Sequence, residues 1–286
     1  MFRIFNKLTS QEQANKLISL VETKNYSELE SQAKNLDINA RNESENRWTA
    51  LLAATKAGDD KAVKILLDNK ADPNLCDFGC QQRSPMDNAA IAGSAESLKL
   101  LLTYGAKHKD SALSWCVYVG NVNCSKLMLE SGADANTKFY ADTLRPPVIV
   151  LASSKGMLEI VNLLITYEVD INAYQGMEGK GYSNSLMCAA RAGHLNCVNR
   201  LLEAGVDINS KNSTGKTAVM YAVEGKRTDC LKALLEKGAN PNLQDVNLET
   251  ALHMAAGTGQ DECVSLLLQH NASPNLKSSA NLKPMF

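Results

Sequence analysis

The 286-residue sequence predicts an all-α solenoid of stacked helix pairs joined by short β-hairpin or loop fingers. The first observation is an apolar residue that recurs at steps of 35, 27, 36, 37, 33 and 33 residues, at Leu51, Met86, Leu113, Ile149, Leu186, Val219 and Leu252. The second is a glycine seven positions after each of these, replaced once, by Lys226. The third is an Asn that closes every unit except the one ending near His108. Since the three sets keep one register, the sequence repeats one structural unit.

Each unit is predicted to be two short helices. The first carries small residues such as Ala255-Ala256, which let neighbouring helices approach closely. The glycine then permits a tight turn, because a residue without Cβ adopts positive φ at little cost. The second helix carries apolar residues at helical spacing, for example Val264, Leu267 and Leu268. Segments rich in Gly, Asn and Asp between the units favour turns and hairpins.

The start of each unit resembles the ankyrin repeat, whose period is about 33 residues with a T-P-L-H-x-A signature. The matching tetrapeptides include Thr250-Ala251-Leu252-His253 and Ser84-Pro85-Met86-Asp87, the second of which keeps the proline. The resemblance implies an ankyrin-repeat solenoid that binds partners through its finger tips and the concave face of its first helices. It also implies that His253 is structural.

The register divides the sequence into a degenerate capping repeat, seven complete repeats and the start of a truncated one. The predicted limits are 1–41 for the cap, 42–74, 75–108, 109–136, 137–172, 173–209, 210–242 and 243–275 for the repeats, and 276–286 for the truncated start. In the cap, Ser10 and Gln13 have the spacing of a capping box. Because Lys283 stands 33 residues after Thr250, we expect truncation of a longer protein rather than docking of the last residues on the final repeat.

Irregular spacings predict where the fingers differ. The 27-residue step predicts a missing finger around Lys107–Asp110. The next two fingers, at about 137–146 and 173–183, are predicted to be long. Insertions in such repeats form loops on one face, often the binding face. Aromatic and flexible residues in these two fingers are predicted to form a contact surface: Phe139, Tyr140, Tyr174, Met177 and Tyr182.

Composition excludes several function classes. The net charge is −1 with both signs mixed along the sequence, so nucleic-acid binding has little electrostatic support. No apolar run is long enough for membrane insertion, and no signal peptide is evident. Eight cysteines without a secretion signal indicate free thiols and a cytoplasmic location.

The cysteines and histidines give no catalytic, metal or cofactor site. Cys124, Cys197, Cys230 and Cys263 occupy equivalent positions of successive units, so we interpret them as buried core residues. Cys76 and Cys80 share one finger, where a metal would need two further ligands not evident nearby. No nucleophile and base converge in the pattern, and we expect no enzyme, no cofactor and no metal.

The residues expected to face a partner come from the long fingers and from the two positions before each glycine. They are Ile91, Tyr118, Phe139, Tyr140, Tyr174, Tyr182 and Arg191. For Tyr118 the alternative is that it fills the gap of the missing finger and serves packing alone. For Trp48 the two alternatives are an anchor for a partner and a shield packed near Arg47 and the first helices.

The sequence therefore predicts a non-enzymatic scaffold, monomeric by itself, that binds one protein or peptide through its concave groove and fingers. The partner's identity is not encoded in the fold. The alternative is a targeting module of a larger enzyme or bacterial effector that continues beyond residue 286, which would place it in the host cytosol.

Overall fold

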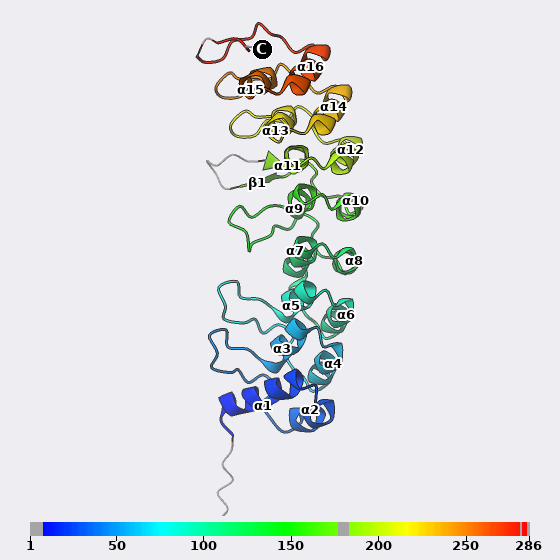
Figure 1. The fold of residues 1–286 in the computed structure, drawn as a ribbon. Coiled ribbons are helices and arrows are strands. Elements are labelled where there is room, and N and C mark those ends of the chain that lie inside the picture. The colour runs from blue at the N-terminus through cyan, green and yellow to red at the C-terminus, as the bar shows by residue number, and fades with distance from the viewer. Residues whose placement is uncertain (1–7, 177–182, 281, 285–286) are drawn as a thin grey trace, which may run out of the picture. The chain divides into compact units, whose positions relative to one another are not determined.

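The computed structural model describes residues 8–176, 183–280 and 282–284. These residues form sixteen helices and one two-stranded sheet, which confirms the predicted fold class (Figure 1). They group into two compact units, Met1–Asp134 and Ala135–Phe286, called unit 1 and unit 2 below. The predicted repeat limits themselves stay a prediction.

Unit 1 is a stack of helix pairs. Its first helices pack in the row α1-α3-α5-α7 and its second helices in the row α2-α4-α6-α8. The helices are α1 (Ser10–Glu22), α2 (Tyr26–Ala33), α3 (Ala50–Ala57), α4 (Asp60–Asp68), α5 (Pro85–Ala92), α6 (Ala95–Thr103), α7 (Lys109–Val119) and α8 (Val122–Glu130). Only five residues separate α6 from α7, so the finger predicted to be missing is absent there. The helix that follows has 11 residues, where α3 and α5 have 8.

Unit 2 repeats the same arrangement. Its first helices form the row α9-α11-α13-α15 and its second helices the row α10-α12-α14-α16. The elements are α9 (Val148–Ser154), α10 (Leu158–Thr166), β1 (Tyr174–Gln175), β2 (Ser183–Asn184), α11 (Ser185–Ala192), α12 (Leu195–Glu203), α13 (Ala218–Glu224), α14 (Thr228–Glu236), α15 (Ala251–Gly257) and α16 (Asp261–Gln269). The two strands are antiparallel, with Tyr174 opposite Asn184, and form the base of one long finger.

Hydroxyl and carboxamide side chains begin most of the first helices, as N-cap chemistry requires. Thr49 Oγ1 accepts the backbone N–H of Leu52 at the start of α3. At α1 the predicted capping box was wrong by one residue, because Thr9 and Glu12 form it. Gln13 instead accepts the backbone N–H of Asp37 with its Oε1, at 2.7 Å.

The recurring Asn connects each finger base to the next one. Its carboxamide oxygen accepts a backbone N–H about one repeat further along the sequence, which satisfies a donor that would otherwise have no partner. In unit 1 the acceptor–donor pairs are Asn39–Asp72 (2.8 Å) and Asn74–Lys107 (2.9 Å). In unit 2 they are Asn136–Asp170 (2.7 Å), Asn172–Asp207 (3.0 Å), Asn209–Asn240 (2.8 Å) and Asn242–Ser273 (2.7 Å). Where the Asn is lacking, Asp110 Oδ1 accepts the N–H of Asp134 at 2.8 Å instead.

The four equivalent cysteines are buried in the second helices, which confirms their interpretation as core residues. All eight cysteines of the protein are free thiols. Burial raises the pKa of Cys230 to about 11 and that of Cys188 to about 12. These thiols are therefore poor nucleophiles at neutral pH.

Candidate partner-binding site

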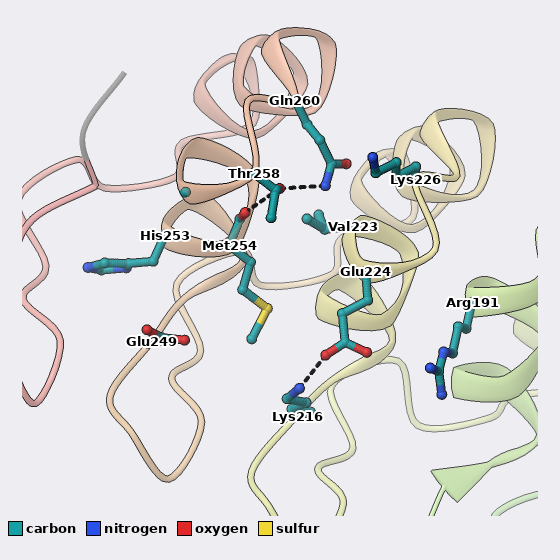
Figure 2. A pocket seen from close by; sticks show the side chains of 11 residues that line it. Arg191, Lys216, Val223, Glu224, Lys226, Glu249, His253, Met254, Thr258 and Gln260 are labelled. Carbon is teal, nitrogen blue, oxygen red and sulfur yellow. Dashed lines mark hydrogen bonds and ion pairs between the residues drawn. The ribbon is translucent and has the colours of Figure 1, made fainter.

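Unit 2 contains an open groove of about 640 Å³ along its first helices (Figure 2). Arg191 reaches it from α11, Glu224 from α13 and Met254 from α15. Lys216 and Glu249 line it from the fingers that precede α13 and α15. We call this surface the α11–α15 groove.

Several polar groups of the α11–α15 groove are paired within the protein. Lys216 Nζ and Glu224 Oε1 form an ion pair. Gln260 Nε2 donates to Thr258 Oγ1, and Thr258 Oγ1 donates to the carbonyl of Met254, both at 2.7 Å (Figure 2). A ligand that enters would meet the Lys216–Glu224 ion pair and the thioether of Met254, whose flexible side chain suits an adaptable contact.

A buried hydrogen-bond cluster supports the groove beside Arg191. Tyr221 lies on α13 and its hydroxyl accepts from Ser183 Oγ at 2.9 Å and from Asn212 Nδ2 at 3.0 Å. All three side chains are buried. The Arg191 guanidinium lies 5.9 Å from the Tyr221 ring centroid, in the range of a cation–π contact. The sequence-predicted Arg191 is therefore held on a rigid support and lines the groove.

In unit 1, the predicted residues Ile91 and Tyr118 lie on α5 and α7. Ile91 is half-buried, and Tyr118 is 43% exposed. The Tyr118 ring contacts the buried Trp115 edge-on, with centroids 5.7 Å apart. Packing on Trp115 thus accounts for part of the Tyr118 surface, and the rest faces solvent.

The long fingers give mixed outcomes. Tyr140 is 66% exposed, and its ring lies 5.6 Å from the guanidinium of Arg145. Tyr174 is half-buried, and its hydroxyl donates to the carbonyl of Lys211 at 3.4 Å. The expectation that Phe139 offers contact surface is corrected, because its side chain is only 3% exposed. Its backbone N–H pairs with the carbonyl of Pro146 across the finger, and the ring is turned inward from that hairpin. Met177 and Tyr182 lie outside the described residues.

Sequence reasoning missed the position five residues before the glycine of each repeat. This position holds Met254 in α15 and Tyr221 in α13, and it holds Asn88 and Trp115 in unit 1. The residue type at this position varies from repeat to repeat, whereas the position two residues earlier is apolar in every repeat. That variation inside a regular repeat was the available signal.

The groove's one histidine, His253, has both ring nitrogens engaged: Nδ1 accepts the N–H of Thr250 at 3.2 Å, and Nε2 lies 3.2 Å from the carbonyl oxygen of Leu282. The Thr250–His253 pair forms a capping box, which agrees with the structural role implied by the resemblance. Within the described ranges, no three His, Cys, Asp or Glu residues are grouped so as to hold a metal ion. None of the described helices has the length and apolar character to cross a bilayer.

Stacked helix pairs define a helical repeat protein. The family description "Ankyrin repeats (3 copies)" matches residues 17–112, 149–245 and 186–278. The protein belongs to the ankyrin-repeat family. Ankyrin repeats are generally non-catalytic protein–protein interaction modules.

Three curated relatives share about a quarter of their aligned residues with this protein. Ankyrin repeat domain-containing protein SAT10 of Stachybotrys chartarum is 26% identical over 187 residues, 63% of this sequence and 9% of that protein. Transient receptor potential cation channel subfamily A member 1 of Homo sapiens is 26% identical over 240 residues, 67% of this sequence and 21% of that protein. Ankyrin repeat and SOCS box protein 6 of Mus musculus is 26% identical over 153 residues, 50% of this sequence and 35% of that protein. The sequence thus spans a minor part of the length of each relative.

Proposed function

We propose that this protein is a non-enzymatic interaction module whose α11–α15 groove binds a segment of a protein partner. The observation that carries the proposal is the 640 Å³ groove itself, open to solvent, with the apolar side chain of Met254 and the Lys216–Glu224 ion pair among its lining residues. Pre-ordered helices and paired side chains lower the entropic cost of association. Tyr140, Tyr174 and the solvent-facing part of Tyr118 are proposed as further contact residues, since exposed tyrosines are favoured as hot spots.

A peptide-display selection against the full-length protein tests this function. Peptides that bind are then measured against Met254→Glu, which places a charge at the centre of the groove. We expect a loss of affinity of about tenfold or more, because a buried unpaired charge is costly at an interface. Gln269→Glu, at an exposed position of α16, is the matched control and is expected to leave affinity unchanged. Equal binding by the two variants would move the site away from this groove.

Alanine substitutions then map the extent of the contact surface. If Tyr118 and Tyr140 contact the partner, each substitution weakens binding by more than about 1 kcal/mol. Unchanged affinity in both variants would confine binding to the α11–α15 groove.

A second candidate is that the array is the targeting module of a larger enzyme or effector. The matched regions make up only 9% to 35% of the length of the three relatives, so in those proteins the repeats are one part of a longer protein, which supports this candidate. Coding sequence downstream of the Phe286 codon would support this candidate, and a stop codon there would exclude a C-terminal catalytic part. We also propose a cytoplasmic location for the interaction module, or the host cytosol if the protein is an effector.

A further inference from the structure

Unit 1 holds a smaller pocket of about 270 Å³ at the base of its first two fingers. Trp48 lines it just before the N-cap of α3, and Arg83 lines it just before the N-cap of α5. Lys56 from α3 and Asn88 from α5 complete the side next to the helices. We call this surface the Trp48 pocket.

Two nitrogen donors of the Trp48 pocket have no hydrogen-bond acceptor among the described residues. They are Nε1 of Trp48 and Nδ2 of Asn88, both enclosed atoms. Asn88 is 4% exposed, so its amide cannot turn to bulk water. A buried donor without an acceptor is costly, and native proteins hold few of them. A ligand that brings oxygen acceptors would recover this cost.

Two cations stand beside these donors. The Lys56 ammonium lies 4.3 Å from the Trp48 ring centroid, and the Arg83 guanidinium lies 4.7 Å from the Trp115 ring centroid. Gln81 Oε1 accepts from Arg83 Nη2 at 2.6 Å and from Nε at 3.0 Å, which fixes the guanidinium. Neither cation belongs to an ion pair with another described residue. Their charge is therefore available to an anion.

The charge balance of the pocket selects the type of anion. Its one lining carboxylate is Asp77, whose Oδ1 already accepts the backbone N–H groups of Gly79 at 3.2 Å and Arg83 at 2.9 Å. Two cationic side chains and this carboxylate give the lining a formal charge of +1. A carboxylate carries one negative charge and matches it, whereas a phosphoryl group brings up to two and faces Asp77.

We propose that the Trp48 pocket binds a carboxylate of the protein partner, from an Asp or Glu side chain or from the partner's free C-terminus. Lys56 pairs with the carboxylate beside the Trp48 ring, and the indole N–H donates to the same carboxylate. Arg83 supplies the second charge, and Asn88 the second neutral donor. The inference rests on the partner-binding function proposed above and adds the chemistry of one contact.

Heteronuclear NMR on the isotope-labelled full-length protein tests the proposal directly. The probes are acetyl-Gly-Ser-Glu-Ser-Gly-amide, its Gln counterpart, acetyl-Gly-Ser-Gly with a free C-terminus, and inorganic phosphate. We expect saturable shifts of the Trp48 indole and Asn88 amide resonances at millimolar Glu peptide, and none with the Gln peptide. The free-C-terminus probe separates the two carboxylate sources. No shift with either carboxylate probe overturns the proposal, and a stronger response to phosphate reassigns the pocket to phosphoryl groups.

Variants separate a specific contact from general attraction. Arg83→Gln and Lys56→Gln are each expected to weaken the carboxylate probe about fivefold or more. Lys64→Gln removes the same charge on α4 of the same unit, where Lys64 pairs with Asp68, and is expected to leave binding unchanged. Trp48→Phe keeps an aromatic ring and removes the donor, so it serves if Arg83→Gln does not fold. Equal losses in Lys64→Gln and Arg83→Gln would reduce the effect to unspecific charge.

The two proposals fail in distinguishable ways. If display-selected peptides bind and respond to Met254→Glu but not to Arg83→Gln, the carboxylate pocket is wrong and the groove stands. If carboxylate probes shift Trp48 while no peptide is selected at all, the groove is wrong and the pocket is a small-anion site.

Discussion

The Trp48 pocket of unit 1 and the α11–α15 groove of unit 2 are built on equivalent positions of the repeat, but they differ in how their polar groups are satisfied. Two positions before the glycine, Glu224 pairs with Lys216, whereas Lys56 has no carboxylate partner in the described part of the protein. Five positions before it, the Tyr221 hydroxyl has two partners, whereas Asn88 Nδ2 finds none among the residues that the structure describes. The repeat fixes where a side chain stands, and the preceding finger decides whether it is satisfied internally or left for a ligand.

The largest expected effect concerns how closely α13 packs on α11. A Cβ added at Gly225 would lie 2.1 Å from the carbonyl oxygen of Arg191, whereas the equivalent residues of unit 1, Ala57 and Ala92, carry a Cβ already. We expect Gly225→Ala to lower the free energy of unfolding by about 2–3 kcal/mol, since the neighbouring backbone must shift. Urea unfolding followed by circular dichroism measures it.

Gly257→Ala is the control for that substitution, because a Cβ there meets nothing within 4 Å. Its expected change is below about 1 kcal/mol, in the stabilising direction of helix propensity. Similar losses in both variants would show that the close approach at Gly225 does not limit the packing of unit 2.

Removing the Tyr221 hydroxyl or the Trp48 indole N–H tests whether polar groups are satisfied in unit 2 and left without a partner in unit 1. Tyr221→Phe leaves the buried donors of Ser183 and Asn212 without their acceptor, so we expect a loss of about 2 kcal/mol. Trp48→Phe removes a donor that has no acceptor within the described ranges, and its expected cost is below about 1 kcal/mol. Thermal and urea unfolding of both variants measure the two losses in free energy of unfolding. A greater loss for Trp48→Phe would mean that the indole N–H is satisfied in unit 1 and not reserved for a ligand.

The fold could be predicted from the sequence because its periodic positions carry the packing. The recurring apolar residue, the glycine and the apolar residues of the second helix are each set by local chemistry that repeats. The recurring Asn could be found in the sequence, but not its purpose, since the hydrogen bond that Asn74 Oδ1 accepts from the Lys107 backbone N–H requires consecutive repeats to be side by side. The burial of Phe139 could not be predicted, because it depends on how one irregular finger folds on itself.

The candidate site could be predicted only in part, for a related reason. Arg191 could be predicted because the two positions before the glycine face outward in the repeats, and Arg191 occupies the first of them. Met254 and Asn88 could not be predicted because their position is buried in some repeats and lines a pocket in others. Whether such a residue has a partner depends on a finger that is variable in length and sequence.

A smaller effect is expected at the replaced glycine of the repeat. Lys226 adopts φ +56°, while Gly259, its counterpart in the next repeat, has φ +63°. Left-handed backbone costs a residue with Cβ about 1 kcal/mol or more relative to glycine. We therefore expect Lys226→Gly to raise the free energy of unfolding by about 0.5–1 kcal/mol and Gly259→Ala to lower it by a similar amount. Urea unfolding measures both, and changes of the same sign would contradict the explanation.

The smallest expected effect is a pH dependence at the third residue of a first helix, where unit 1 has Asp87 and unit 2 has His253. Burial raises the pKa of Asp87, although hydrogen bonds, including those from Ser84, oppose the shift. A carboxyl whose folded-state pKa is raised contributes stability below its unfolded pKa and loses that contribution as pH rises through the folded value. Wild type should therefore lose free energy of unfolding relative to Asp87→Asn as pH rises from the ordinary carboxyl pKa of 3.8 through the raised folded-state pKa. Urea unfolding across that window measures the difference, with Glu22→Gln on the exposed face of α1 as the control. Parallel curves for wild type and Asp87→Asn would mean that the buried carboxyl of unit 1 is as well satisfied as the capping histidine of unit 2.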